Sequence, residues 1–134
     1  MKTVTDPTPK KLQRLTLNSK LIKTIIAAIH EKKGEEIISI NLKKIPEAVA
    51  DFFIVCEGSN PNLIKAIADN IEKMVQQECG EKPFKFEGKS GEKWILVDYV
   101  NVVVHCMTPD VRGFYAIEDL WHDAEQKEHN ELKK

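Results

Sequence analysis

The sequence predicts an α/β fold in which a mixed sheet is flanked by helices, and two observations lead to this prediction. The strand-like segments 94–99 and 102–107 are separated only by Val100 and Asn101, a connection that fits an antiparallel hairpin. The apolar segment 51–57 is followed by a helical pattern and then by another strand. Such a crossover unit requires that the sheet be at least partly parallel.

The first half of the chain predicts one helix and two strands. Residues 18–33 have the spacing of an amphipathic helix, which Gly34 ends, and its stripe consists of Leu21, Ile22, Ile25, Ile26 and Ile29. Residues 36–42 alternate loosely between apolar and polar and predict a strand. Pro46 breaks the pattern that follows. Residues 51–57 form the most continuous apolar run, so we expect a central strand covered on both faces.

The second half predicts two helices around three strands. A helix is expected from Pro61 to Gly80, with an apolar stripe of Leu63, Ile64, Ile67, Ile71, Met74 and Val75. Residues 84–87 predict a short strand that leads into the hairpin. After the hairpin, Thr108 and Pro109 start a helix that we expect to fold back over the sheet through Val111, Phe114, Tyr115, Ile117, Leu120 and Trp121.

Composition divides the chain into three parts. Residues 1–17 are polar, basic and rich in proline and predict a mobile arm, while residues 18–124 predict a single α/β domain. Residues 125–134 are almost wholly polar and predict a frayed tail. The sequence contains no apolar run long enough to span a bilayer and no signal-like start, so we expect a cytoplasmic protein without a membrane partner.

The charge balance bears on the kind of partner. Lys and Arg number 20 against 21 Asp and Glu, which gives a formal net charge of −1. A protein that binds nucleic acid through phosphates is expected to have a basic excess or a basic face. We therefore expect no direct sequence-specific binding of nucleic acid. Cys56, Cys79 and Cys106 lack the close pair spacing of zinc sites, and we expect free thiols, buried at Cys56 and Cys106.

One family resemblance extends over most of the domain. Its elements are Trp-Ile-Leu-Val-Asp-Tyr at 94–99, Val-Val-Val-His at 102–105, and the later set Arg112, Phe114, Tyr115, Ile117, Glu118, Leu120 and Trp121. Ala-Asp-Phe-Phe-Ile-Val-Cys-Glu-Gly at 50–58 also fits. In order and spacing, residues 34–124 resemble the ribosomal silencing factor family, also called RsfS or Iojap. The chain departs from the family pattern at Val100-Asn101, where Gly-Asp is common, and at Gly113, where a larger residue is usual.

The resemblance implies a fold, a partner and a mechanism. It implies an α/β sandwich similar to that of nucleotidyltransferases. It also implies a homodimer that binds the large ribosomal subunit through the ribosomal protein numbered fourteen of that subunit. Bound there, such a protein blocks association with the small subunit and represses translation when nutrients are limiting.

The same resemblance selects candidate contact residues. Taken from the residues alone, Trp94 favours packing on the core, because large aromatic side chains are mostly buried. The resemblance instead places its counterpart at the docking surface, where a partly exposed indole is a typical hot spot. The partner-binding candidates are Lys93, Trp94, Ile95, Asp98, Tyr99, Arg112 and Tyr115. We expect Arg112 to pair with Asp98 or Asp51, or to reach the partner, and His105 receives no role.

Two alternatives are weighed against ribosome binding. Nucleotidyl transfer needs a phosphate-binding loop and paired carboxylates for magnesium, but Gly58-Ser59 is followed by a strand with only Glu87 as an acid. Asp98 and His105 lie on adjacent strands as half of an acid-base pair without a nucleophile. We expect no catalytic activity and no cofactor. The other alternative is a dimeric interaction module with a different partner.

Overall fold

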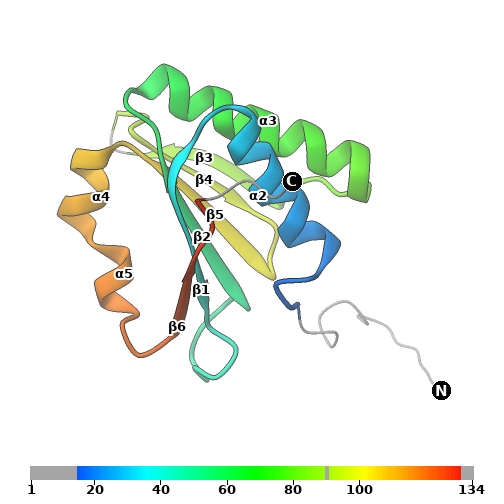
Figure 1. Ribbon diagram of the computed structural model, residues 1–134, viewed down its shortest axis with the longest axis vertical. Helices are drawn as coiled ribbons and strands as arrows, with labels where there is room; N and C mark the ends of the chain where they lie inside the picture. The colour runs from blue at the N-terminus through cyan, green and yellow to red at the C-terminus, as the bar shows by residue number, and fades with distance from the viewer. Residues whose placement is uncertain (1–14, 90, 131–134) are drawn as a thin grey trace.

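In the described part of the chain, six strands form one mixed sheet with helices on both faces (Figure 1). The computed structural model describes residues 15–89 and 91–130. The strand order is β3-β4-β5-β2-β1-β6, in which β2 and β5 are parallel and all other neighbouring pairs are antiparallel. The predicted α/β class, the mixed sheet and the inner position of β2 are confirmed.

The elements have the following bounds. The strands are β1 Glu35–Asn41, β2 Phe52–Glu57, β3 Lys85–Lys89, β4 Trp94–Asp98, β5 Val102–Met107 and β6 Glu125–Glu128. The helices are α2 Lys20–Glu31, α3 Pro61–Cys79, α4 Pro109–Tyr115 and α5 Ile117–Leu120.

Helices α2 and α3 cover one face of the sheet, as Figure 1 shows. The start of α3 is fixed by Asn60, whose side-chain oxygen accepts a hydrogen bond of 2.9 Å from the Leu63 backbone N–H. Its end is set by Gly80, with φ of 68°. The two helices bury their apolar stripes against Phe52, Ile54, Cys56, Ile95, Val97, Val102, Val104 and Cys106. Side chains alternate along a strand, so the neighbours of these residues point to the opposite face.

The opposite face has a smaller core beneath α4 and α5. Its buried members are Ile40, Leu42, Val55, Met107, Val111 and Ile117. Phe53, Trp94 and Trp121 pack around them and remain only partly buried. This side of the sheet therefore leaves aromatic side chains partly exposed.

The β4–β5 hairpin confirms the predicted antiparallel pairing, and its turn is strained. Val100 has φ of 73°, and a β-branched residue rarely adopts that left-handed region. The turn is held by Asp98, whose carboxylate accepts a hydrogen bond of 2.7 Å from the Val100 N–H. Val100 thus stands at a position where the backbone conformation favours glycine, the residue that is common there in the family.

The predicted last helix is wrong in its continuity and in part of its buried face. Ala116 adopts φ of 46° and divides it into α4 and α5. Phe114 and Tyr115 on α4 and Leu120 on α5 are 80%, 42% and 72% exposed instead of buried. Ala is not a residue that usually ends a helix in this conformation, which is why spacing alone did not reveal the break.

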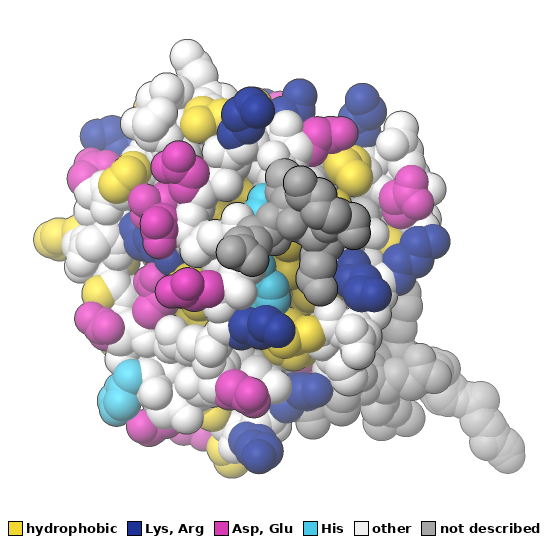
Figure 2. All heavy atoms as spheres, viewed as in Figure 1, with side chains coloured by type: hydrophobic (Ala, Val, Ile, Leu, Met, Phe, Trp, Pro, Cys, Tyr) yellow, Lys and Arg dark blue, Asp and Glu magenta, His cyan; other side chains and the backbone are white. Residues whose placement is uncertain are grey.

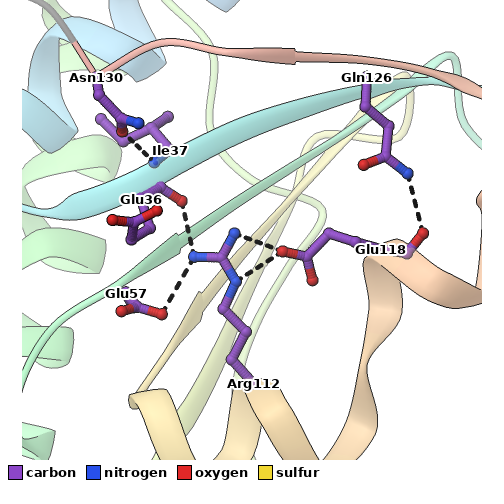
Figure 3. A network of polar contacts seen from close by, with 7 residues as sticks. All are labelled: Glu36, Ile37, Glu57, Arg112, Glu118, Gln126 and Asn130. Atoms are coloured by element: carbon purple, nitrogen blue, oxygen red, sulfur yellow. Dashed lines mark hydrogen bonds and ion pairs between the residues drawn. The ribbon is translucent and has the colours of Figure 1, made fainter.

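The predicted tail is wrong for residues 125–130. β6 pairs antiparallel with β1, and the His129 N–H donates to the Ile37 carbonyl at 2.8 Å. The Asn130 side chain accepts from the Ile37 N–H at 2.7 Å (Figure 3). Without these partners the backbone groups of β1 would be unpaired on this side. A polar strand satisfies them as well as an apolar strand does, because the bonds come from backbone.

The predicted N-terminal arm also ends earlier than expected. Leu15 and Leu17 pack against the main core, and the Leu15 N–H donates to the Asp51 carboxylate at 3.0 Å. Residues 1–14 of that prediction lie outside the described part of the chain. Among the described residues, no helix is both long and apolar enough to cross a membrane.

Candidate docking surface around Trp94

Trp94 is the first residue of β4 and lies between an edge strand and α4. It pairs with Lys89 of β3 on one side and with Met107 of β5 on the other. The indole packs on Tyr115, with ring centroids 4.8 Å apart, and the Lys89 ammonium lies 5.8 Å from the indole centroid. The side chain is partly buried. The indole of Trp94 is therefore neither fully packed in the core nor fully exposed, the two possibilities that the sequence left open.

Phe114 and Tyr115 extend this aromatic surface. Their rings meet edge to face with centroids 5.0 Å apart, and both side chains are exposed. We call Lys89, Lys93, Trp94, Phe114 and Tyr115 the Trp94 surface. Exposed aromatic side chains flanked by lysines give a large rigid contact area with a charged rim, which is typical of protein-binding sites.

Lys93 is held at the rim by the start of α4. Its ammonium lies 3.6 Å from the Asp110 carboxylate, and its carbonyl accepts from the Thr108 N–H at 2.9 Å. The Thr108 hydroxyl donates to the Asp110 carboxylate at 2.6 Å, and this bond is the main reason that the pKa of Asp110 is lowered. The loop before α4 and the start of β4 are therefore joined.

His105 anchors the buried edge of the Trp94 indole. The indole N–H donates to His105 Nδ1 at 3.1 Å. The imidazole is only 4% exposed, and its ring centroid lies 4.6 Å from that of Phe53. Burial, together with the charge of Lys89, lowers the pKa of His105 from 6.5 to about 4. The imidazole is therefore neutral at physiological pH.

Asp98 and His105, which the sequence places on adjacent strands, do not pair with each other. The register places Leu96 opposite His105 and Asp98 opposite Val103. Asp98 instead accepts from the Val100 N–H and stabilises the hairpin turn at the far end of β4 from Trp94. His105 has Trp94 as its hydrogen-bond partner, so this pair does not form an acid-base arrangement.

Arg112 does not pair with Asp98 or Asp51, as the sequence suggested, but with three groups beside α4 (Figure 3). Its Nε and Nη2 donate to one carboxylate oxygen of Glu118, the first at 2.8 Å. Its Nη1 donates to the Glu36 carbonyl at 2.7 Å and to the Glu57 carboxylate at 3.3 Å. The residue is buried, so it joins α4 and α5 to β1 and β2 and does not face a partner.

Ile95 and Tyr99 are also removed from the predicted contact set. Both point to the face covered by α2 and α3, where they are 2% and 6% exposed. The structure thus brings together Lys93, Trp94 and Tyr115 and separates them from Ile95, Asp98, Tyr99 and Arg112. Sequence reasoning missed Lys89 and Phe114. The β3–β4 register would have identified Lys89, but Phe114 fitted the expected buried stripe of the last helix.

The Gly58-Ser59 loop packs closely on the start of α3. A Cβ at Gly58 would lie 3.0 Å from Leu63 Cγ, so this glycine permits close packing of the loop on α3. Its N–H donates to the Met107 carbonyl at 3.1 Å. Within residues 15–89 and 91–130, no group of three or more His, Cys, Asp or Glu side chains is arranged to hold a metal ion.

Comparisons with known proteins agree with the family resemblance. The profile of the family described as ribosomal silencing factor during starvation matches residues 16–134. The chain belongs to the ribosomal silencing factor family. A member named ribosomal silencing factor RsfS, from Halalkalibacterium halodurans, is 37% identical over 107 residues, which cover 80% of this chain and 90% of that relative.

This member of the silencing factor family is also similar to a solved bacterial structure and to a more distant mouse protein. A crystal structure of a protein from Chromobacterium violaceum is similar with a TM-score of 0.72 and 32% identity, over 85% of this chain and 92% of that one. A mouse protein named mitochondrial assembly of ribosomal large subunit protein 1 is 28% identical over 75% of this chain and 44% of the relative. The predicted fold and family are confirmed.

Proposed function

We propose that this chain binds the large ribosomal subunit and sterically blocks its association with the small subunit, which represses translation when nutrients are limiting. Membership of the silencing factor family supports this function. The observation that carries the proposal is the partly buried Trp94, which is held between Tyr115 and His105, with exposed Phe114 packed on Tyr115. Such an indole supplies the rigid anchor that a protein-binding surface needs.

We further propose that the contact on the subunit is a ribosomal protein, the one numbered fourteen, and that Lys93, Trp94 and Tyr115 contact it directly. On the face of the molecule seen in Figure 2, Lys and Arg side chains lie among Asp and Glu side chains. The net charge of −1 gives no general attraction for RNA phosphates. At the Trp94 surface itself, the Asp110 carboxylate lies beside Lys93, and an aromatic surface with charges of both signs at its rim fits a protein better than it fits bare RNA.

The mechanism is mutual exclusion, and it requires no catalysis. A protein that binds only the free large subunit shifts the subunit equilibrium toward separation, by an amount that depends on its concentration relative to its dissociation constant. We propose that the protein acts in the cytoplasm, where the subunits are located. Enzymatic activity is not part of this proposal, and its absence stays a prediction.

We also propose a homodimer. The support is a set of large apolar side chains that are exposed in a single chain, namely Val49, Phe84, Phe114 and Leu120. In the homodimer that the family resemblance implies, a second copy of the chain would cover such side chains. Sedimentation at tens of micromolar tests the proposal, and a monomer at that concentration would contradict it.

The central experiment uses purified ribosomal subunits. Light scattering follows the joining of large and small subunits while the protein is titrated, and we expect the extent of association to fall as the protein binds. Excess small subunits should weaken its apparent affinity for large subunits. If association proceeds unchanged while the protein is demonstrably bound to large subunits, the proposed mechanism is wrong.

A further inference from the structure

The hydrogen bond between Trp94 and His105 fixes the protonation of the imidazole. An indole nitrogen is only a donor, so His105 Nδ1 must accept and is unprotonated. The neutral ring therefore carries its proton on Nε2. We propose that His105 is a positioning residue of the Trp94 surface, whose Nδ1 holds the indole in the orientation that meets the ribosomal partner. This inference rests on the proposed function.

The indole needs such an anchor because its other contacts leave it freedom to turn. Tyr115 and Lys89 pack on it, with centroid distances of 4.8 and 5.8 Å, and such contacts tolerate sliding of the ring. A hydrogen bond is directional and weakens steeply when it bends. The bond to Nδ1 is therefore the contact that selects one orientation of the Trp94 side chain.

The other ring nitrogen, Nε2, indicates that a histidine at position 105 does not serve the stability of the fold. Among the described residues, His105 Nε2 is buried and has no hydrogen-bond partner. Burying an unpaired donor is unfavourable, so an apolar side chain of similar size would suit this core better. The favourable polar contact of the ring is the one that Nδ1 makes with Trp94. Function at the Trp94 surface accounts for the histidine.

The surroundings also keep Nδ1 available as an acceptor. Protonation on Nδ1 would remove the bond to the indole. Burial and the positive charge of Lys89 both disfavour the imidazolium and lower the pKa of His105 to about 4. The anchor is therefore present across the physiological range of pH.

The test separates the acceptor from the shape of the ring. His105→Phe keeps a ring and removes the acceptor, whereas His105→Asn places an oxygen near the position of Nδ1. The matched control is Cys106→Ala, a buried neighbour on β5 that points to the opposite face. Binding to purified large subunits is measured for each variant, alone and in a Trp94→Phe background. The Trp94 indole N–H is followed by NMR, and the wild-type imidazole nitrogens report the tautomer.

We expect His105→Phe to move the Trp94 indole signal and to weaken binding about tenfold, as the loss of one positioned hydrogen bond predicts. His105→Asn should restore most of the affinity, and Cys106→Ala should bind as the wild type does. In the Trp94→Phe background, His105→Phe should have no additional effect. The wild-type spectrum should show an unprotonated Nδ1.

Several results would overturn the inference. Wild-type affinity in His105→Phe, or the same loss in the Trp94→Phe background, would show that the bond does not position the indole. The opposite imidazole tautomer would contradict the geometry without the use of any variant. If the wild type binds and only these results fail, the proposed function stands. If the wild type does not bind large subunits, the proposed function fails and this inference fails with it.

Discussion

Arg112 and Glu118 join the two short C-terminal helices through a pair of hydrogen bonds to one carboxylate oxygen. Nε and Nη2 of the guanidinium both donate to Oε2 of Glu118, across the break at Ala116. The same guanidinium reaches the Glu36 carbonyl, where φ is 49° and the pairing of β1 with β2 is irregular. One side chain therefore fixes α4, which presents Phe114 and Tyr115, to the sheet.

We expect Arg112→Ala to lower the free energy of unfolding by about 3–5 kcal/mol, because it leaves carboxylates unpaired in a partly buried site. Arg112→Lys should also be destabilising, since one ammonium cannot match the planar fork of donors. Urea denaturation measures both changes. Lys65→Ala is the control, because its ion pair with Asp69 is exposed and should contribute less than about 0.5 kcal/mol. A similar, small effect at both sites would contradict the prediction.

The contacts of Arg112 show where sequence reasoning ends. The hairpin, the inner strand β2 and the helices α2 and α3 follow from local periodicity and turn residues. Two of the partners of Arg112, Glu36 and Glu57, lie far from it in sequence, and no periodic pattern predicts these contacts. For the same reason β6 could not be predicted, because its residues are all exposed and it is held by backbone pairing with the distant strand β1.

The candidate site was predictable only in part, for a related reason. The family resemblance assigns both Trp94 and Ile95 to the contact set, but side chains alternate along a strand, so the two point to opposite faces of the sheet. The strand pattern alone does not tell which of these faces is covered by α2 and α3. The resemblance identified Trp94, yet the supporting role of His105 depends on the register between β4 and β5. The short turn of the hairpin fixes that register, but the sequence does not show that the Trp94 indole N–H turns toward His105 Nδ1.

Val100→Gly should stabilise the fold. Val100 is 41% exposed and has φ of 73°, a conformation that is unfavourable for a β-branched residue and free of that cost for glycine. We expect a gain of about 1 kcal/mol, because removal of the strain outweighs the greater flexibility of glycine in the unfolded chain. Thermal or urea unfolding measures it. Val102→Gly, at a buried strand position two residues later, is the control and should be strongly destabilising. A loss of stability in Val100→Gly would contradict the strained turn.

The stability of the fold should fall in mild acid because of His105. Its pKa is 6.5 in the unfolded chain and about 4 in the folded protein, so between these values only the unfolded state takes up the proton. The free energy of unfolding that depends on neutral His105 is fully present above pH 6.5 and is lost as the pH falls toward 4. The loss is about 1.4 kcal/mol for each pH unit and about 3 kcal/mol in total. Urea unfolding at several pH values measures this loss.

Two histidines contribute to that slope, and a variant separates them. Burial, Lys127 and His30 also lower the pKa of His129, so His129 acts with the same sign. His105→Phe should therefore flatten most of the pH dependence between 6.5 and 4 and leave the part that His129 contributes. If the slope is the same with and without His105, the imidazole is not buried in its neutral form.

Trp94→Ala should fold and lose its partner. The indole is only partly buried, so its removal should cost less than the about 3–5 kcal/mol that truncation of a core tryptophan costs. A central aromatic anchor contributes about 2 kcal/mol or more to binding, so we expect affinity for large subunits to fall at least about thirtyfold. Lys65→Ala is the control, because Lys65 is exposed on α3, which covers the opposite face of the sheet from Trp94, so its truncation should leave binding unchanged. Thermal unfolding and subunit binding are measured on the same preparations.

A Trp94→Ala variant that melts far below the parent would mean that Trp94 is a core residue and that its loss of binding is indirect. A stable variant that no longer binds would instead separate the docking role of the indole from its packing.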